Sequence, residues 1–313
     1  MLGLSLHIHN QAKEMPTKTP KKSSTQPIDI KTAKFIVTGG SGSFGRNIIK
    51  RLLALGAKDI TSISRDEDLI KQAQIDVNSP FVKFKLGDIT DKDTIAHLMK
   101  DADVVFHAAA IKHVSLAEQN PREAYRVNIV GLLNLLDASS NVKRFVHISS
   151  DKAIGVMNCY GSTKLLGEYL VDESNSLYNK DTYLVTRCPN LLGSRGSVTD
   201  IWAQQLKKFN KITITDPDMT RYFVTLSDAA KFIVEIGLSA TVSANKKYYP
   251  LKYTKKYKLN DLAKAFLKVR GNKDSKIEVT GITAGEKTHE DYISDVKLCS
   301  VDELVTTLKE VFN

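Results

Sequence analysis

The sequence predicts an α/β fold in which a doubly wound parallel sheet carries a smaller, interleaved α/β lobe. Two features of the chain between Lys34 and Arg187 indicate the sheet. Short apolar runs of strand length alternate with stretches in which apolar residues recur at helical spacing. A cluster of glycines separates the first apolar run from the first helical stretch. Strands that alternate with helices in this way run parallel and are joined by right-handed crossovers.

Six strands are expected in this part of the chain, and helical stretches separate most of them. The first helix is marked by Ile48, Ile49, Leu52 and Leu53, and a long helix begins near Tyr160. The expected strands cover residues 35–38, 60–63, 82–86, 104–107, 144–149 and 182–187.

Beyond Pro189 the alternation loosens, with loops expected around residues 193–197 and 215–220. We assign this part of the chain to the smaller lobe. Its further expected elements are a strand at 247–252 and helices at 259–269 and 301–312.

Composition limits the classes of protein that this chain can belong to. Its 313 residues are 42% hydrophobic and 26% charged, which is typical of a globular protein with a sizeable core. The three cysteines, Cys159, Cys188 and Cys299, share no CxxC spacing, so we expect a reducing, cytoplasmic setting and a packing role for Cys159. No uncharged apolar stretch is long enough for a membrane span. No His, Cys and carboxylate cluster has metal-ligand spacing, so no metal is expected.

The formal net charge of +10 raises the question of nucleic acid binding. Six lysines and two acidic residues up to Lys34 account for +4 of it, in a stretch rich in Thr, Ser and Pro. We therefore interpret residues 1–33 as a disordered basic leader, either solvated or serving a partner or localisation, and expect no nucleic acid partner.

The most informative local pattern is the segment Thr38-Gly39-Gly40-Ser41-Gly42-Ser43-Phe44-Gly45. Gly39, Gly42 and Gly45 give GxxGxxG between an expected strand and an expected helix. Glycine allows the backbone to turn tightly and to approach a pyrophosphate, and the helix N-terminus beyond it offers amide donors. A purely structural turn is the alternative. The position of the glycine segment directly after the first strand favours a Rossmann-like dinucleotide site.

The end of the second strand bears on the type of dinucleotide. Ser64 and Arg65 occupy the position at which a basic residue would accept a 2′-phosphate and an acid would bind a ribose 2′-hydroxyl. This favours NADP over NAD, although Asp66 is adjacent. Asp88, after the third strand, would reach the adenine edge or else cap the helix that starts near Asp91.

Tyr160 and Lys164 form a YxxxK pattern and lie four residues apart on one helix face. The ammonium group would lower the pKa of the phenol, which is about 10 when unperturbed. A phenolate would take a proton from a substrate hydroxyl while hydride leaves the same carbon.

Together, TGGSGSFG, the run Ala108-Ala109-Ala110 and YxxxK resemble the extended short-chain dehydrogenase/reductase superfamily. Within it, the chain resembles the inverting UDP-N-acetylglucosamine 4,6-dehydratases of polysaccharide and flagellin-glycan synthesis. The resemblance runs from about Lys34 to Glu290. It rests on HAAAIKHVSLAEQNP (107–121), SSDKAIGVMNCYGSTK (149–164), NLLGSRGS (190–197) and TDPDMTRYFVT (215–225).

The resemblance implies catalytic roles for the segment Ser150-Asp151-Lys152. Tyr160 is the base for the 4-hydroxyl and Ser150 its hydrogen-bonding partner. Oxidation at C4 acidifies the C5 proton, Lys152 removes it, and Asp151 protonates the departing 6-hydroxyl; hydride then returns to C6. Since an adjacent Asp and Lys would normally form an ion pair, a proton must move between them inside a closed site, and the two should titrate as a unit. A surface ion pair is the alternative.

The resemblance also implies binding residues. Those expected at the cofactor are Gly39, Ser41, Gly42, Ser43, Phe44, Gly45, Ser64, Arg65, Asp88, Ile89, Ala108, Ala109, Ala110, Lys112, Tyr160 and Lys164. Those expected at the nucleotide sugar are Lys112, His113, Glu118, Asn190, Arg195, Arg221 and Glu286. His113 could equally be a structural histidine. The chain departs from the family's pattern at Thr283-Ala284, where Arg-Pro is usual, and at Gly155-Val156, where Asn-Pro is usual.

We therefore expect an NADP-binding Rossmann core at 34–188, to which 222–250 return, and a nucleotide-sugar-binding lobe formed by 189–221 and 251–313. The expected function is NADP-dependent dehydration of UDP-N-acetylglucosamine with inversion at C5, in a homo-oligomer, dimer or hexamer. One alternative is a nucleotide-sugar 4-epimerase or 4-reductase, which would not need Asp151 and Lys152. Another is a non-catalytic NADP-binding sensor, which would not need Ser150, Tyr160 and Lys164.

Overall fold

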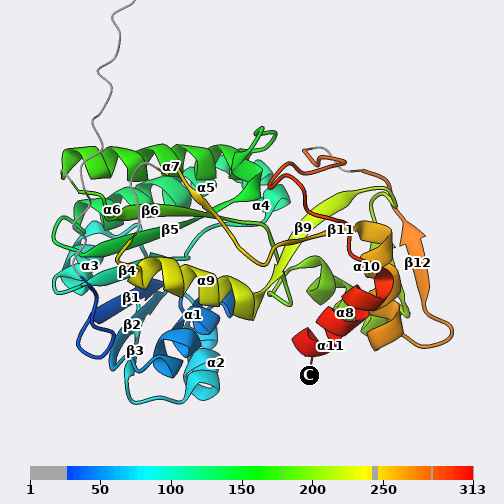
Figure 1. Cartoon of the computed structure of the whole chain (residues 1–313), viewed down its shortest axis with the longest axis horizontal. Helices are drawn as coiled ribbons and strands as arrows, with labels where there is room; N and C mark the ends of the chain where they lie inside the picture. Colours follow the sequence, from blue (N-terminus) through cyan, green and yellow to red (C-terminus); the bar gives the residue numbers. More distant parts are fainter. Residues whose placement is uncertain (1–26, 179, 242–245, 283–284, 313) are drawn as a thin grey trace, which may run out of the picture.

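A seven-stranded parallel sheet forms the centre of the computed structural model, which describes residues 27–178, 180–241, 246–282 and 285–312 (Figure 1). The strand order is β10-β6-β5-β4-β1-β2-β3, and every neighbouring pair is parallel. The strands are β1 (Lys34–Thr38), β2 (Asp59–Ser64), β3 (Val82–Leu86), β4 (Val104–His107), β5 (Arg144–Ser150), β6 (Tyr183–Cys188) and β10 (Tyr249–Pro250).

The order makes this a Rossmann-like, doubly wound sheet, as the sequence predicts. The chain proceeds from β1 outward to β3, then returns across the sheet to β4 and proceeds in the other direction. The change of direction between β1 and β4 leaves a crevice at the carboxyl ends of these strands, where ligands bind in such folds. The helices that accompany this sheet include α1 (Ser43–Ala54), α2 (Glu67–Val77), α3 (Lys92–Met99), α4 (Val114–Gln119), α5 (Pro121–Tyr125), α6 (Gly131–Asp137), α7 (Cys159–Leu177) and α9 (Leu226–Leu238).

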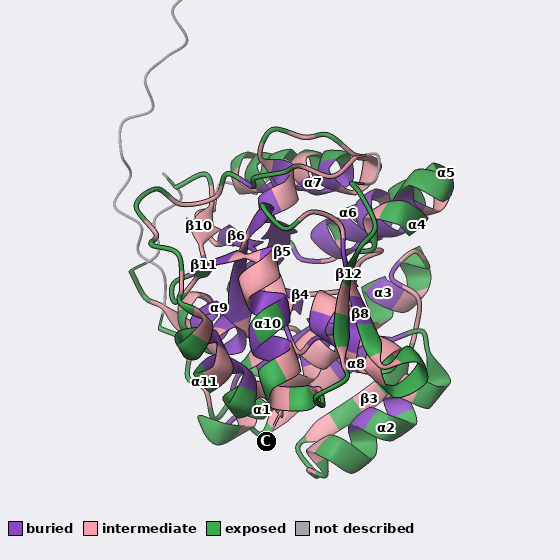
Figure 2. Cartoon of the chain, turned by 90° about the vertical axis from the view of Figure 1, so that its right-hand side faces the viewer, coloured by how far each residue is buried: buried purple, intermediate pink, exposed green. Residues whose placement is uncertain are grey.

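Each face of the sheet has its own apolar layer. On one face, Ile48 and Leu52 of α1 pack with Phe232 of α9 against β1 and β4. On the other, residues of α3, α6 and α7, including Leu132, pack against β4, β5 and β6. Strands β5 and β6 are buried along their whole length, which Figure 2 shows in purple, because both of their faces are covered.

A second lobe lies at one end of the sheet, at the right of Figure 1. It holds a three-stranded sheet, β11-β9-β7, and a two-stranded sheet, β12-β8. Trp202, Tyr257 and Phe266 lie in its apolar core. Its elements are β7 (Asn190–Leu192), α8 (Val198–Phe209), β8 (Lys211–Ile214), β9 (Thr220–Thr225), β11 (Lys255–Lys258), α10 (Leu259–Arg270), β12 (Lys276–Val279) and α11 (Val301–Phe312).

The structure differs from the sequence prediction in several details. The strand expected at 247–252 shortens to β10, because Pro250 has no amide hydrogen and the amide of Leu251 donates to the Tyr292 hydroxyl instead of a strand. Residues 222–225 belong to β9 of the small sheet, although Val224 already packs into the core of the main sheet that α9 continues. The leader expected at 1–33 lies for the most part outside the described residues.

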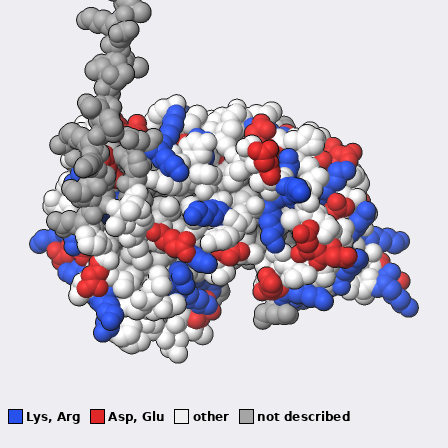
Figure 3. All heavy atoms as spheres, viewed as in Figure 1, with Lys and Arg blue, Asp and Glu red and all other residues white. Residues whose placement is uncertain are grey.

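On the face shown in Figure 3, basic and acidic side chains are interspersed. No helix among the described ranges is long and apolar enough to cross a membrane.

Candidate active site

The glycine segment turns from β1 into α1 and brings its backbone against the loop after β4. Gly39 has a φ of 67°, and a Cβ there would lie 2.9 Å from the Ala109 amide nitrogen. A Cβ at Gly45 would lie 2.3 Å from the Gly39 carbonyl oxygen. Ser41 donates its amide to the Ser64 hydroxyl at 3.1 Å, which joins the segment to the end of β2. The turn therefore requires glycine and directs the N-terminus of α1 at the cavity, as a diphosphate site needs.

Some residues after β2 and β3 cap the following helices, and others are free to face the cavity. Asp66 accepts from the Leu69 amide at 2.9 Å and is the N-cap of α2. Arg65 is about half exposed, lines the cavity, and pairs with Glu123 at 3.6 Å. Because Asp66 is occupied in capping, Arg65 is the better placed of the two to meet a ligand. Asp91 caps α3, whereas Asp88 accepts from the amide and hydroxyl of Thr90, so Asp88 is not the helix cap.

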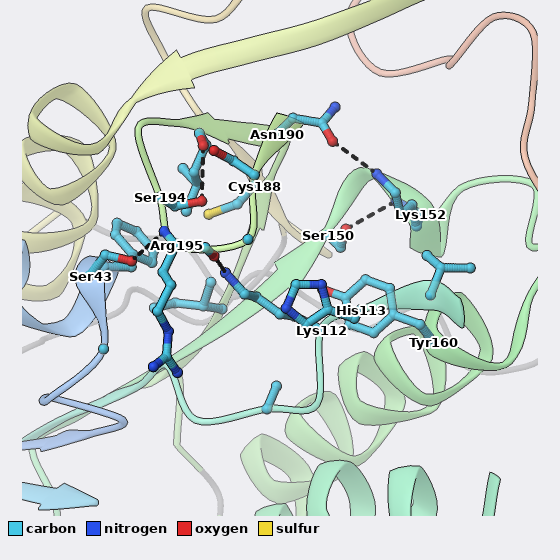
Figure 4. Close-up of a pocket in the computed structure, with 18 of the residues that line it drawn as sticks. Ser43, Lys112, His113, Ser150, Lys152, Tyr160, Cys188, Asn190, Ser194 and Arg195 are labelled. Carbon is cyan, nitrogen blue, oxygen red and sulfur yellow. Dashed lines mark hydrogen bonds between the residues drawn. The ribbon is translucent and has the colours of Figure 1, made fainter. Parts of the chain in front are cut away.

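The opposite wall of the cavity is a loop that follows β7. The backbone amide of Arg195 donates to the Ser43 hydroxyl at 3.1 Å. The backbone carbonyl of Arg195 accepts from the Lys112 ammonium at 2.6 Å (Figure 4). Burial and the nearby Arg195 lower the pKa of Lys112. Burial, with Lys112 and Arg195, also lowers the pKa of His113, whose ring lies against Gly196. These contacts hold basic groups from both lobes around one space, which suits a diphosphate ligand.

Ser150, at the end of β5, and Tyr160 and Lys164, on α7, line the same cavity. Burial raises the pKa of Tyr160 to about 12, although the Ser150 hydroxyl lowers it. Burial lowers the pKa of Lys164 to about 8. The expectation that Lys164 lowers the pKa of the phenol is therefore wrong for this structure, because burial raises that pKa and the groups that lower it are Ser150 and Lys152.

Asp151 and Lys152 lie beyond β5 in a short 3₁₀ turn, Asp151–Ala153. The Lys152 ammonium lies 3.2 Å from Asp151 Oδ1 and 2.9 Å from Glu290 Oε1, and it also donates to Asn190 Oδ1 at 3.3 Å (Figure 4 shows Lys152 and Asn190). Burial raises the pKa of Asp151 to about 7, and the negative Glu290 adds to this, while Lys152 opposes it. Asp151 is therefore largely a neutral acid below that pH.

Lys152 and Glu290 form the ion pair of this cluster. Burial alone would lower the pKa of Lys152, but Asp151 and Glu290 outweigh it and raise the pKa. Burial alone would raise the pKa of Glu290, but Lys152 and Arg221 lower it to about 2. Lys152 is thus an ammonium ion in this structure, and the pair expected from the sequence is a cluster of three.

Sequence reasoning missed two buried polar residues that shape the site. Glu290 comes from the loop before α11, 138 positions from Lys152. Asn128 lies in a π-helical turn, Arg126–Val130, where its amide bonds both backbone groups of Ile111 and the Thr163 hydroxyl. It thereby joins the loop after β4 to α7. A polar residue inside the apolar stretch 127–136 was the only available signal for Asn128.

The structure brings every expected site residue except one to a single cavity of about 780 Å³. The exception is Glu118, which is exposed and accepts a hydrogen bond from the Cys159 amide at the start of α7, outside the lining of the cavity. The departure at Thr283-Ala284 lies outside the described residues, whereas Gly155 is described and has a φ of 50°. The part of the chain that the structure describes contains no group of three His, Cys, Asp or Glu arranged to hold a metal.

Comparison with known proteins identifies a family and several relatives. The sequence model of a family described as "Polysaccharide biosynthesis protein" matches residues 35–308. A UDP-N-acetylglucosamine 4,6-dehydratase (inverting) of Campylobacter jejuni subsp. jejuni is 38% identical over 267 residues, 83% of this chain and 77% of that protein. A UDP-glucose 4-epimerase of Rickettsia bellii is 34% identical over 280 residues, 86% of this chain and 80% of that protein.

Among solved structures, Pen from Bacillus thuringiensis superimposes with a TM-score of 0.78 at 32% identity, covering 85% of this chain and 83% of that one. The chain spans about half the length of two further curated polysaccharide biosynthesis proteins that it matches.

Proposed function

The chain belongs to the polysaccharide biosynthesis protein family, and from that membership we propose that it is a nucleotide-sugar enzyme that removes water from UDP-N-acetylglucosamine with inversion at C5. The observation that carries the proposal is the meeting of Asp151 and Lys152 with Ser150, Tyr160 and Lys164 in one cavity. Oxidation and reduction at C4 need only the last three groups. Loss of water across C5 and C6 needs a further base and a further acid.

The groups around the glycine turn fit a nicotinamide dinucleotide. The close backbone approach at Gly39 and Gly45 leaves room for a diphosphate, and α1 presents its N-terminus there. We propose NADP because Arg65 is available for a 2′-phosphate while Asp66 is committed to the cap of α2. When bound, NADP would accept hydride at C4 of the sugar and return it to C6.

Three proton transfers of the proposed reaction have a residue for them, and a fourth, the return of a proton to the opposite face of C5 as hydride adds to C6, completes the inversion. Tyr160 takes the proton of the 4-hydroxyl, which Ser150 orients. Asp151 donates a proton to the 6-hydroxyl, which leaves as water, and the raised pKa of Asp151 supports this role. Lys152 takes the C5 proton. Because Lys152 is an ammonium ion before the reaction, this role requires that it first passes a proton to Glu290, the neighbouring carboxylate that is ionised while Asp151 is neutral.

We propose that the sugar nucleotide lies between the lobes, with its diphosphate among basic side chains. Arg195 and Arg221 line the cavity from the second lobe, and an arginine can offer two parallel hydrogen bonds to a diphosphate. In this proposal Asn190 is also near the diphosphate, Lys112 and His113 are beside the sugar, and Glu286 is near the uridine ribose.

A 4-epimerase is the second candidate, because the Rickettsia relative carries that name. The two are separated by incubating the protein with NADP and UDP-N-acetylglucosamine in deuterated water and recording the product by NMR and mass spectrometry. Loss of one water with deuterium at an inverted C5 is the expected result. Water loss with C5 retained would refute inversion, and a 4-epimer that keeps its water would refute dehydration. NADP binding without turnover would indicate a sensor.

A further inference from the structure

The buried cluster around Lys152 contains a second carboxylate, Glu290, besides Asp151. Glu290 Oε1 lies 2.9 Å from the Lys152 ammonium, nearer than Asp151 Oδ1 at 3.2 Å. The side chains of both acids are almost fully buried, with 8% of Glu290 and 1% of Asp151 exposed. One ammonium ion therefore faces two acids in a space with little water.

The contacts of the two acids are unequal. Glu290 Oε2 accepts from the Asn190 amide at 3.1 Å, and its other oxygen lies 3.7 Å from Nε of Arg221. Asp151 Oδ1 accepts from the Ser150 hydroxyl at 2.9 Å, while its buried Oδ2 has no donor among the described residues. A hydrogen bond between the two acids raises the pKa of Asp151 and lowers that of Glu290. Donors thus surround Glu290, which stabilises its ionised form, whereas half of the Asp151 carboxyl group lacks a donor.

From this geometry we propose that Glu290 is a positioning residue that takes the charge of Lys152 into its own ion pair and so keeps Asp151 protonated. The inference rests on the proposed function, because a protonated Asp151 is what the departing 6-hydroxyl requires. Glu290 acts through its two neighbours and does not itself exchange a proton with the substrate.

The charges and titratable groups around Asp151 agree with this assignment. Lys152 is the cation that lowers the pKa of Asp151, and Glu290 raises it. With Glu290 uncharged, Lys152 would have Asp151 as its only carboxylate partner among the described residues, and the Asp151 pKa would fall. The groups that face the pair from the surrounding elements are Lys152, Arg221, Tyr160, Cys188 and Tyr292.

The test is the pH profile of water loss from UDP-N-acetylglucosamine, measured as kcat in the wild type and in Glu290→Gln. In the wild type, kcat should fall as the pH rises through about 7, where Asp151 loses its proton. In Glu290→Gln this limb should move to lower pH by about one to three units. At a pH above the Asp151 pKa of both proteins, each unit by which this pKa falls in the variant reduces the protonated fraction of Asp151 about tenfold. Glu290→Gln should still oxidise C4, which is measured as the reduced nicotinamide formed in a single turnover.

Asp295→Asn is the matched control, since it neutralises an exposed carboxylate five positions away at a φ of 63°, which asparagine tolerates. Its profile should equal that of the wild type. Glu290→Asp keeps the charge but moves it farther from the Lys152 ammonium. The falling limb of its pH profile should therefore lie between those of the wild type and Glu290→Gln. This variant also serves if the Gln variant does not fold.

Two results would overturn the inference. One is a Glu290→Gln or Glu290→Asp profile whose limb stays at the wild-type pH, which would mean that the carboxylate has only a structural role. The other is a limb that moves to higher pH. A wild type that does not remove water at all would instead refute the proposed function, so the two failures are distinguishable.

Discussion

Breaking the buried ion pair between Glu168 and Arg187 should strongly destabilise the protein next to the site. Glu168 lies on α7 and Arg187 on β6, and their side chains are 0% and 8% exposed. Two hydrogen bonds of 2.8 and 2.7 Å join the guanidinium to the carboxylate. The Ser149 hydroxyl donates to the same carboxylate at 2.5 Å. The pair thus fixes the helix of Tyr160 against the end of β6, and Ser149 ties the same helix to the end of β5.

Glu168→Gln keeps the shape of the side chain and removes its charge, which leaves the Arg187 guanidinium buried without a counter-ion. Breaking a buried pair in this way typically costs about 3–5 kcal/mol. The Tyr248 ring, 3.7 Å below the guanidinium, recovers part of this, so we expect the lower end of the range. The free energy of unfolding is measured by urea titration.

Glu67→Gln is the matched control, because Glu67 pairs with Lys71 at 2.9 Å on the exposed face of α2. It should cost at most about 0.5 kcal/mol. A double variant, Glu168→Leu with Arg187→Met, removes both buried charges and should be more stable than Glu168→Gln alone. A Glu168→Gln variant that unfolds within about 1 kcal/mol of the wild type would refute the reasoning.

Three further changes test the site. Gly45→Ala places a Cβ 2.3 Å from the Gly39 carbonyl oxygen, so it should abolish dinucleotide binding measured by calorimetry; wild-type affinity would contradict the close approach. Arg65→Ala should weaken NADP about tenfold to a hundredfold, the value of one or two charge-assisted hydrogen bonds, and leave NAD unchanged in the same titration; an equal loss for both would remove the 2′-phosphate assignment. Lys152→Met should abolish water loss, followed by mass spectrometry, and leave NADP bound; full activity would exclude Lys152 as the C5 base.

The sequence predicts the large sheet well and the second lobe poorly, for a physical reason. Strands β1, β4, β5 and β6 are buried along almost their whole length, and each contains a short apolar run that the sequence shows. Strands β11 and β12 of the lobe, Lys-Lys-Tyr-Lys and Lys-Ile-Glu-Val, are short and charged. Their pairing with β9 and β8 depends on tertiary contacts that have no local signal.

The same contrast holds within the site. The glycine segment and the Tyr160–Lys164 pair are local patterns, because one turn and one helix face determine their geometry. Glu290 reaches Lys152 only through the fold of the second lobe, and nothing in its neighbourhood in the chain indicates the contact. Glu118 shows the converse. It lies within a matching segment, yet its carboxylate bonds the start of α7 instead of facing the cavity.

Burial has a consequence for how the first proton transfer begins. In this structure the pKa of Tyr160 is about 12 and that of Lys164 about 8, because desolvation favours the neutral form of each. A phenolate is therefore costly until another positive charge lies close by. The oxidised nicotinamide ring carries such a charge, whereas the reduced ring does not. We expect Tyr160 to become a competent base only beside the oxidised cofactor, which ties deprotonation of the 4-hydroxyl to the state that can accept its hydride.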